Sequence, residues 1–238
     1  VLFRGELREP WGIAIPDACD LRPMLPGFVE HVIPFHVAEE GFFWIRAGDR
    51  PPLRIAAGEA VFLPQGSRHR LGGEEEASTE PVGAVLPHPP WDEAPVVRHG
   101  GAGAPARIVC GFVSCEDLLL DPFLVGLPPV LHARPGPDPR SRWMETAIRY
   151  TAHEAGRRGP GSRLVLSRLV ELMFVEVLRD HMRSADEAEM GWLAASGDAV
   201  VAHALASIHG APAEPWTVVR LARRVGVSRT VLAERFAR

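Results

Sequence analysis

Apolar residues in the first half of the chain come in short runs that glycine and proline separate at close spacing. Clear examples are residues 42–48, 53–58, 59–66 and 107–114, with the sequences FFWIRAG, LRIAAG, EAVFLPQG and RIVCGFVS. Runs of this length, bounded by glycine or proline, are typical of strands joined by tight turns. The pattern up to residue 118 therefore predicts a β-barrel or a β-sandwich.

The spacing of apolar residues changes in the second half of the chain. In residues 141–156 and 161–184 they recur at steps of three and four, which predicts two helices. Residues 132–141 form a proline-rich linker before them. The longer helix has a broad apolar face made of Leu164, Leu166, Leu169, Leu172, Met173, Val177 and Leu178. This width fits core packing alone, and it also fits pairing with a second chain in a homodimer.

The stretch from Trp216 to Arg238, WTVVRLARRVGVSRTVLAERFAR, contains local signals for two short helices. Thr217 and Ser228 are residue types that cap helix N-termini, and Gly226 lies between the helices, where the turn needs a positive φ angle. The predicted buried positions are Val218, Leu221, Ala222, Val225, Val231, Leu232 and Phe236. Two short helices joined by a glycine turn predict a helix-turn-helix, with a helical hairpin that binds no DNA as the alternative.

A helix-turn-helix places its second helix in the major groove of double-stranded DNA. The predicted DNA-contacting residues are Arg220, Arg224, Ser228, Arg229, Thr230, Ala233 and Glu234. Glu234 can accept a hydrogen bond from a cytosine amino group, and Thr230 can touch a thymine methyl group. We expect the arginines to lie near phosphates of the DNA backbone.

The distribution of charge agrees with a DNA-binding segment at this end. Residues 216–238 hold six arginines and one acidic residue, which gives this segment a net charge of +5. Because the whole chain has a net charge of −4, the rest of it is at −9. Such an asymmetry is typical of nucleic-acid-binding segments, although a solvated basic helix face produces it too.

The composition is that of a globular protein without a membrane helix. The chain has 238 residues, of which 46% are hydrophobic and 24% charged, as in ordinary globular proteins. No apolar run reaches the roughly 18 residues of a membrane helix, so no membrane association is expected. Three cysteines, Cys19, Cys110 and Cys115, are too few for a disulfide framework, so we expect a cytoplasmic protein.

The C-terminal stretch resembles the first helix-turn-helix of AraC-type transcriptional regulators. The matching positions are Leu221, Ala222, Gly226, Val227, Ser228, Leu232, Arg235 and Phe236. In that family, the residues that face the bases match Thr230, Ala233 and Glu234. The family carries two such motifs joined by a long helix, and this sequence ends within the first. The resemblance therefore implies a bacterial transcription factor whose DNA-binding part is half present and binds DNA weakly.

The first half resembles the cupin-type sensor domains that are attached to AraC-type regulators. Residues 34–48, PFHVAEEGFFWIRAG, are similar to the first cupin motif, and residues 58–70, GEAVFLPQGSRHR, to the second. The matching positions of the second motif are Gly58, Pro64, Gly66 and His69. The resemblance implies a cupin-like barrel that senses a small molecule or a metal.

Cupin metalloenzymes hold their metal with a His-x-His pair, a glutamate and a later histidine. Aligned on Gly48, this chain keeps His36 and His69, but it has Pro34 and Gly41 in place of the first histidine and the glutamate. Two imidazoles are too few for a durable site. We therefore expect no enzymatic activity, with a cupin metalloenzyme that has a degenerate site as the alternative.

A zinc site of another composition is a second hypothesis for the barrel. Cys110 and Cys115 lie on a predicted strand, and with His36 and His69 they would complete a tetrahedral set of Zn²⁺ ligands. Positions five apart face opposite sides of a strand unless a bulge near Gly111 intervenes. The alternative is that Cys110 is a small buried apolar residue.

Without a metal, the interior of the barrel is a candidate pocket for an unidentified small-molecule effector. The candidate lining residues are His36, His69, Trp11 and Trp44. Each of them also fits a core position, and for the two tryptophans the core is the favoured interpretation.

Together these patterns predict an α+β protein. Residues 1–118 are expected to form a cupin-like sensor barrel, residues 119–195 a helical connector that can dimerise, and residues 196–238 a first helix-turn-helix. The predicted function is ligand- or metal-responsive regulation of transcription, with double-stranded DNA and a small-molecule effector as partners. A sensor module that binds no DNA is the remaining alternative.

Overall fold

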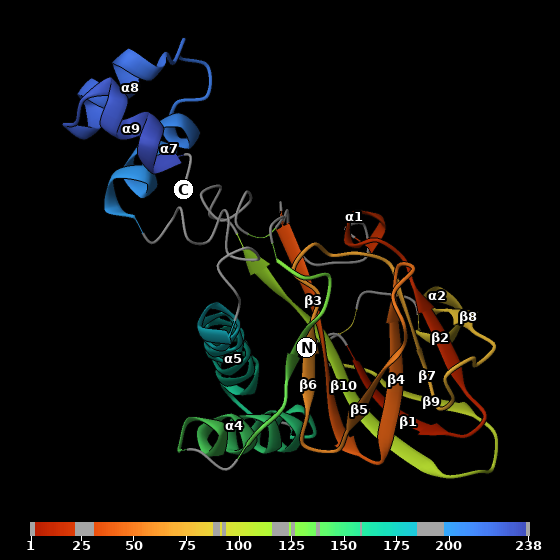
Figure 1. Cartoon of the computed structure of the whole chain (residues 1–238). Coiled ribbons are helices and arrows are strands. Elements are labelled where there is room, and N and C mark those ends of the chain that lie inside the picture. Colours follow the sequence, from red (N-terminus) through yellow and green to blue (C-terminus); the bar gives the residue numbers. More distant parts are fainter. Residues whose placement is uncertain are drawn as a thin grey trace. The chain divides into compact units, whose positions relative to one another are not determined.

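The computed structural model describes residues 3–21, 31–87, 91, 94–115, 124, 127–136, 139–157, 159–184 and 198–236 (Figure 1). By its internal contacts the chain divides into two compact units. The first unit comprises Val1–Glu116 and Pro128–Leu178, and the second comprises Asp117–Leu127 and Arg179–Arg238. The finer domain boundaries at residues 118 and 195 stay predictions from the sequence.

The described elements are strands in the first half and helices in the second. The strands are β1 Phe3–Arg8, β2 Gly12–Ile15, β3 His31–Glu40, β4 Phe42–Ala47, β5 Leu53–Ala56, β6 Ala60–Phe62, β7 His69–Gly72, β8 Glu80–Pro81, β9 Val96–Gly100, β10 Pro105–Cys115 and β11 Leu131–Ala133. The helices are α1 Ala18–Leu21, α2 Val82–Val85, α4 Pro139–Ala155, α5 Ser162–Ser184, α7 Ala199–Gly210, α8 Val218–Val225 and α9 Arg229–Phe236.

The strands of the first unit form two sheets. One sheet has the strand order β11-β6-β3-β10-β1-β9, and the other has the order β5-β4-β7-β2-β8. Apolar residues of both sheets share one buried core, to which Phe3, Ile13, Phe43, Leu71 and Ile108 belong. The predicted α+β class is therefore confirmed. The interior lies between two sheets rather than inside one continuous sheet.

The second cupin motif, residues 58–70, contains β6 and the turn that leads into β7. Gly58 and Gly66 have φ angles of 84° and 65°, which residues with a side chain adopt only at a cost. The N–H group of Gly66 donates to the Leu63 carbonyl oxygen at 2.9 Å. A Cβ atom at Gly66 would lie 2.7 Å from the Cβ of Ala18, so the turn needs glycine for space as well. The turn ends where His69 begins β7.

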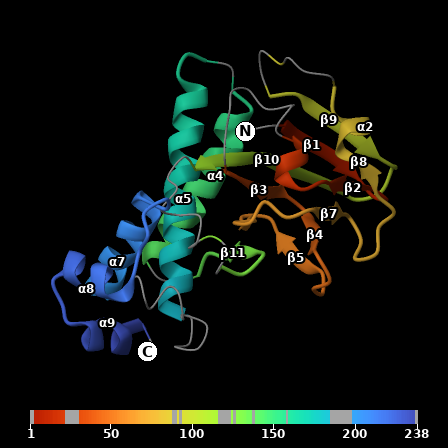
Figure 2. The ribbon, with the colours of Figure 1, turned by 90° about the horizontal axis from the view of Figure 1, so that it is seen from above.

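Helices α4 and α5 lie against the outer face of the six-stranded sheet (Figures 1 and 2). The Phe62 ring of β6 lies 6.0 Å from the Phe35 ring of β3 and 5.4 Å from the Phe174 ring of α5, measured between ring centroids. This stack of buried aromatic rings joins the sheet to the helix. The predicted helices at 141–156 and 161–184 agree with α4 and α5 to within two residues at each end.

Helix α5 has two apolar sides with different surroundings. The buried side consists of Leu166, Val170, Met173, Phe174 and Val177. The exposed apolar residues are Leu164, Val165, Leu172 and Val175. The broad apolar face predicted from the sequence is therefore divided, because only one side of the helix meets the sheet and α4.

The second unit contains three described helices, α7, α8 and α9. Ala204 of α7, Leu221 and Ala222 of α8, and Leu232 of α9 form its small buried core. Helix α7 ends at Gly210. Within the described ranges, no helix is long and apolar enough to cross a membrane.

Candidate functional site

Helices α8 and α9 form a capped helical hairpin. The Thr217 hydroxyl oxygen accepts a hydrogen bond from the Arg220 N–H at 3.2 Å, and the Ser228 hydroxyl oxygen accepts one from the Val231 N–H at 3.2 Å. Gly226 has a φ angle of 76° and ends α8 in the left-handed conformation. Both predicted caps and the predicted glycine turn are therefore confirmed. Local side-chain chemistry alone fixes these ends.

The predicted buried faces of the two helices are wrong at three positions. Val218, Val231 and Phe236 are 49%, 37% and 43% exposed. Only Leu221, Ala222 and Leu232 are buried, against α7. Each helix has eight residues, so one neighbouring helix covers only a narrow stripe of its surface.

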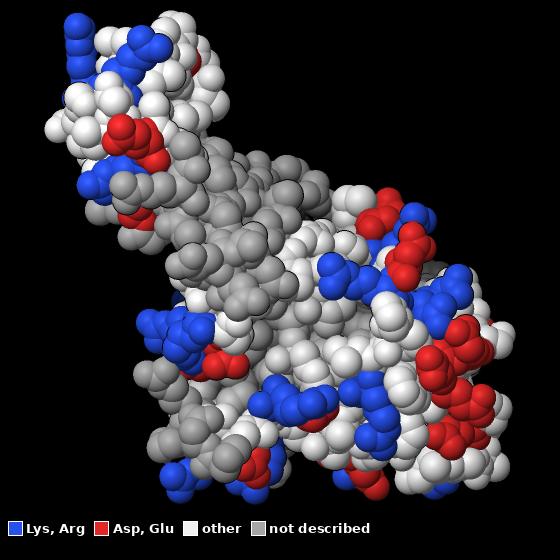
Figure 3. Space-filling view, in the orientation of Figure 1, with Lys and Arg blue, Asp and Glu red and all other residues white. Residues whose placement is uncertain are grey.

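All seven predicted DNA-contacting residues are exposed on this unit, where Figure 3 shows arginine side chains at the surface. They are Arg220, Arg224, Ser228, Arg229, Thr230, Ala233 and Glu234. Arg220 has partners within the unit: its Nη2 atom lies 2.6 Å from Glu214 Oε2, and its Cζ atom lies 5.3 Å from the Trp216 ring centroid. The remaining guanidinium N–H groups can still meet a phosphate.

A polar cluster is buried between the two sheets. It consists of His36 on β3, Cys110 on β10 and His69 on β7, which are 2%, 1% and 3% exposed. The Nδ1 atom of His36 lies 2.9 Å from Cys110 Sγ, and its Nε2 atom lies 2.7 Å from His69 Nε2. His36 and Cys110 meet because β3 and β10 pair in a register that sets these two residues opposite each other.

The direction of each hydrogen bond in this cluster follows from the contact between His69 and the Ser67 carbonyl oxygen. The Ser67 carbonyl oxygen lies 2.8 Å from His69 Nδ1 and can only accept, so His69 Nδ1 carries a proton and donates. A neutral His69 then accepts at Nε2 from the Nε2–H of His36. His36 in turn accepts at Nδ1 from the thiol of Cys110. Every member is paired while all three groups are uncharged.

Burial also favours the uncharged forms. It lowers the pKa of His69 to about 4, although the Ser67 carbonyl and Asp17 act in the opposite direction. Burial, with a smaller effect of His69, holds the pKa of His36 well below its ordinary value. Burial raises the pKa of the Cys110 thiol well above its ordinary value. The cluster is therefore neutral at physiological pH.

The arrangement of these side chains does not fit one zinc ion. Cys110 and His69 lie at opposite nitrogen atoms of the His36 ring, so the three do not converge on one point. Cys115 pairs with His31, five positions along β10 from Cys110, which is about 17 Å along a strand. No group of three or more His, Cys, Asp or Glu side chains in the described part of the chain is arranged for a metal ion. A four-ligand zinc site stays a prediction from the sequence.

The four residues predicted to line an interior pocket do not lie together. Trp11 is buried in the core between the sheets, and among the described residues its indole N–H has no hydrogen-bond partner. Trp44 lies on the outer face of the five-stranded sheet, because its neighbours Phe43 and Ile45 point inward. The structure therefore contradicts an interior position for Trp44, whereas His36 and His69 are inside.

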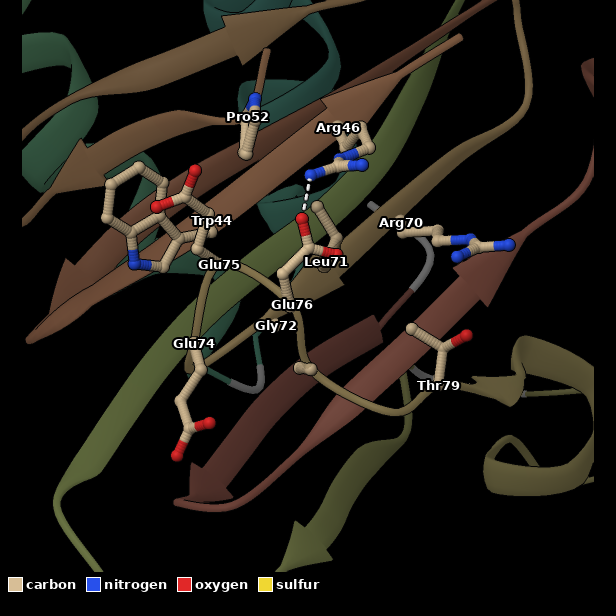
Figure 4. Close-up of a pocket in the computed structure, with 11 residues that line it drawn as sticks. Trp44, Arg46, Pro52, Arg70, Leu71, Gly72, Glu74, Glu75, Glu76 and Thr79 are labelled. Carbon is tan, nitrogen blue, oxygen red and sulfur yellow. Dashed lines mark hydrogen bonds and ion pairs between the residues drawn. The ribbon is translucent and has the colours of Figure 1, made fainter. Parts of the chain in front are cut away.

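Trp44 instead lines a shallow depression on the outer face, with Arg46, Arg70 and Glu76 among its neighbours (Figure 4). Glu76, from the loop after β7, forms an ion pair with Arg46. Sequence reasoning missed these charged residues, because the loop that contains Glu76 reads only as a polar linker between strands.

The loop fits closely on this face because two paired positions beneath it have no side chain. Gly12 of β2 and Gly72 of β7 are paired neighbours. A Cβ atom at Gly12 would overlap the Ser78 carbonyl oxygen, and one at Gly72 would lie 2.6 Å from the Ala77 Cβ. Two adjacent glycines therefore form the surface on which the loop packs.

One chain thus combines a two-sheet unit that contains the cupin motifs with a capped helical hairpin, α8 and α9. A family profile described as Cupin matches residues 1–183. The chain belongs to this cupin family.

Two curated relatives and one solved structure are similar to this chain. Over 209 residues, the chain is 34% identical to an AraC-like transcription regulator of Streptomyces antibioticus, covering 86% of this chain and 66% of that protein. It is 25% identical over 186 residues to the HTH-type transcriptional regulator AlkR of Acinetobacter baylyi, covering 76% of this chain and 59% of that protein. The crystal structure of the AraC-like transcriptional activator CuxR aligns with 87% of this chain and 61% of that chain at 19% identity, with a TM-score of 0.37. That score is too low to support an argument. The curated relatives confirm the resemblance to AraC-type regulators, and the chain spans just under two thirds of their length.

Proposed function

We propose that this chain is the sensor unit and first DNA-binding unit of a ligand-responsive transcription regulator of the AraC type. The observation that supports it most is the capped helix-turn-helix formed by α8 and α9, whose predicted DNA-contacting residues are all exposed. Its curated relatives are described as transcription regulators. A bacterial cytoplasm, where such a protein meets DNA, is the proposed location.

Salt-dependent binding to double-stranded DNA tests this function. The probe is a set of duplexes that tile the promoter region of the protein's own gene. We expect binding whose logarithm of affinity falls linearly with the logarithm of salt concentration, because arginines displace counterions from phosphates. If the chain binds none of these duplexes at about 50 mM salt, with or without a cell extract that supplies effector, the proposal is wrong.

The proposed sensing centre is the buried cluster of His36, His69 and Cys110. It is a polar group in an otherwise apolar core, and strand β3 also carries Phe35, which packs toward α5 through Phe62. An effector that changes the cluster would act by binding two arrangements of the chain with different affinity. The effector itself is a small molecule or a metal ion.

Elemental analysis separates these two kinds of effector. Purified protein is compared with the Cys110→Ser variant. One zinc per chain that disappears in the variant would support a metal-sensing centre and would require the side chains to turn toward one point. Equal trace amounts in both samples would favour an organic effector.

We propose no enzymatic activity for this unit. Pro34 and Gly41 stand where a cupin metalloenzyme has a histidine and a glutamate, and the curated relatives are regulators. A degenerate cupin metalloenzyme remains the second candidate. Turnover of any substrate that depends on His36 and His69 would favour it.

Homodimer formation through α5 is the proposed quaternary structure. Val165, Leu172 and Val175 form an exposed apolar stripe on this helix. If two copies pair antiparallel about Leu172, Arg168 of one copy comes opposite Glu176 of the partner subunit, since both lie four positions from the centre. In such a pair, residues of opposite charge would flank the apolar stripe.

A further inference from the structure

Helix α9, which carries the proposed base-facing residues, is held by few apolar contacts. Leu232 is its one buried residue among those described, at 1% exposure, whereas Val231 and Phe236 are exposed. The Ser228 cap fixes only the first turn. A single apolar anchor in the middle of an eight-residue helix leaves its tilt weakly determined.

The second half of α9 has a polar anchor on α7. Asp198 is the N-cap residue of α7, where one carboxylate oxygen accepts hydrogen bonds from the Val200 N–H at 2.8 Å and the Val201 N–H at 3.3 Å. Its other oxygen, Oδ2, accepts from Nη1 of Arg235 at 2.6 Å. One carboxylate therefore joins the start of α7 to the last turn of α9.

The two anchors of α9 are spaced so that together they set its direction. Leu232 and Arg235 are three residues apart, about 4.5 Å along the helix axis and on one side of the helix. Thr230, Ala233 and Glu234 are exposed between and beside these anchors. A helix fixed at two points on one side presents its remaining side in one orientation.

We propose that Asp198 is a positioning residue for base recognition, which acts by holding Arg235 so that α9 keeps the orientation in which Thr230, Ala233 and Glu234 meet the bases. This inference rests on the proposed DNA-binding function. Arg235 then serves the fold of the unit and makes no DNA contact of its own. Base preference depends on the pair, while attraction to phosphates depends on the other arginines.

The experiment measures how strongly the chain prefers one DNA sequence over another, and not only its affinity for DNA. The full chain first selects a preferred duplex from a random-sequence pool. Its affinity for that duplex is then divided by its affinity for an unselected duplex. The variants are Asp198→Asn, Arg235→Gln and the double variant. Asparagine keeps an N-cap acceptor for α7, and the double variant keeps the net charge of the wild type.

The preference ratio is expected to fall about fivefold in each single variant, a size typical of coupling between exposed charged pairs. It should fall no further in the double variant, because the two residues act through one contact. Arg235→Lys, which retains a cation for Asp198, should keep most of the preference. A matched control is the double variant Asp180→Asn with Arg183→Gln, which removes an ion pair of 3.1 Å on α5 and should leave the ratio unchanged.

Three results would overturn the inference. A double variant with the wild-type preference ratio would make the pair an ordinary surface contact. Arg235→Gln lowering affinity for both duplexes, with a salt slope reduced by about one, would make Arg235 a phosphate contact. Loss of the preference in step with loss of helical signal at the assay temperature would make the role purely structural. Failure of the wild type to bind any duplex would instead contradict the proposed function.

Discussion

At the scale of single residues, the central feature is the histidine that lies between a thiol and a second histidine. His36 uses one ring nitrogen as an acceptor and the other as a donor, so the chain of hydrogen bonds from Cys110 to Ser67 is complete. A completed neutral chain costs little to bury, whereas one added proton would have no counter-ion among the cluster's members. The cluster therefore links folding to pH.

Acid should destabilise the metal-free protein. The pKa of His69 is about 4 in the fold against an ordinary value of 6.5, so between these values the unfolded chain binds a proton that the folded chain does not. Stability is fully present above pH 6.5 and is lost as the pH falls toward 4, by about 3 kcal/mol. Urea unfolding of chelator-treated protein at neutral pH and near pH 5 measures the part of this loss present at pH 5, about 2 kcal/mol. His153→Gln, a change at an exposed histidine, should keep the same pH dependence, and an equal free energy of unfolding at both pH values would contradict the neutral cluster.

At the scale of elements, alternation along strands decides which residues face the core. Strand β4 points Phe43 and Ile45 inward, so Trp44 and Arg46 face outward beneath the loop after β7. The same alternation on β3 sends His36 to the core and Phe35 toward the helices. One strand therefore contacts both the buried His36 cluster and, through Phe62, the helical layer.

Replacement of Gly12 by alanine should destabilise the first unit. The new Cβ atom would overlap the Ser78 carbonyl oxygen, which is backbone and cannot turn away. We expect a loss of about 1–3 kcal/mol in the free energy of urea unfolding. Gly83→Ala is the matched control, since a Cβ atom there meets nothing within 4 Å. Equal effects of the two changes would show that the loop does not pack on the glycines in solution.

Replacement of Leu172 by arginine should prevent pairing through α5. Leu172 is 56% exposed, so the change should leave the unfolding free energy nearly unchanged while it places like charges at the centre of the stripe. Sedimentation velocity should show a shift from dimer to monomer. Val96→Arg, at another exposed apolar residue, serves as the control. A dimer that persists in Leu172→Arg contradicts the interface. Val177, which the sequence places on the same face, is buried and cannot serve in this test.

At the scale of the whole molecule, charge is divided between the two ends of the chain. The segment from residue 216 is at +5 and the remainder is at −9. If the proposed function holds, the acidic remainder reduces adhesion of the first unit to nucleic acid and contact with DNA is directed to α8 and α9.

Two variants should distinguish electrostatic attraction to the DNA backbone from recognition of the bases. Arg224→Ala should weaken binding to every duplex and lower the salt slope by about one, because it removes a proposed phosphate contact. Glu234→Ala should relax the preference at one base pair, at a cost of about 1–3 kcal/mol for the preferred base. Arg54→Ala, which removes the same charge from an arginine that lies over the Phe42 ring in the first unit, is the control for net charge. If Arg54→Ala reduces binding as much as Arg224→Ala, the helix-turn-helix is not the contact surface.

The sequence by itself determined the local features of this protein. Thr217, Gly226 and Ser228 set the helix ends of the hairpin, because caps and a positive φ angle depend on only a few neighbouring residues. The pattern of the apolar positions likewise predicted the strands β4, β5, β6 and β10 and the helices α4 and α5. These features could be predicted because their causes lie within one stretch of chain.

Only the tertiary structure decided what each side chain faces. The exposure of Val218 and Phe236, the outward direction of Trp44 and the division of α5 depend on which element lies opposite. The opposite ring nitrogens of His36 meet different partners because two strands distant in sequence, β10 and β7, approach it from two sides. Periodicity states that a residue is apolar or polar at a given spacing. It cannot state how much of a helix one neighbour covers, or at which atom two distant side chains meet.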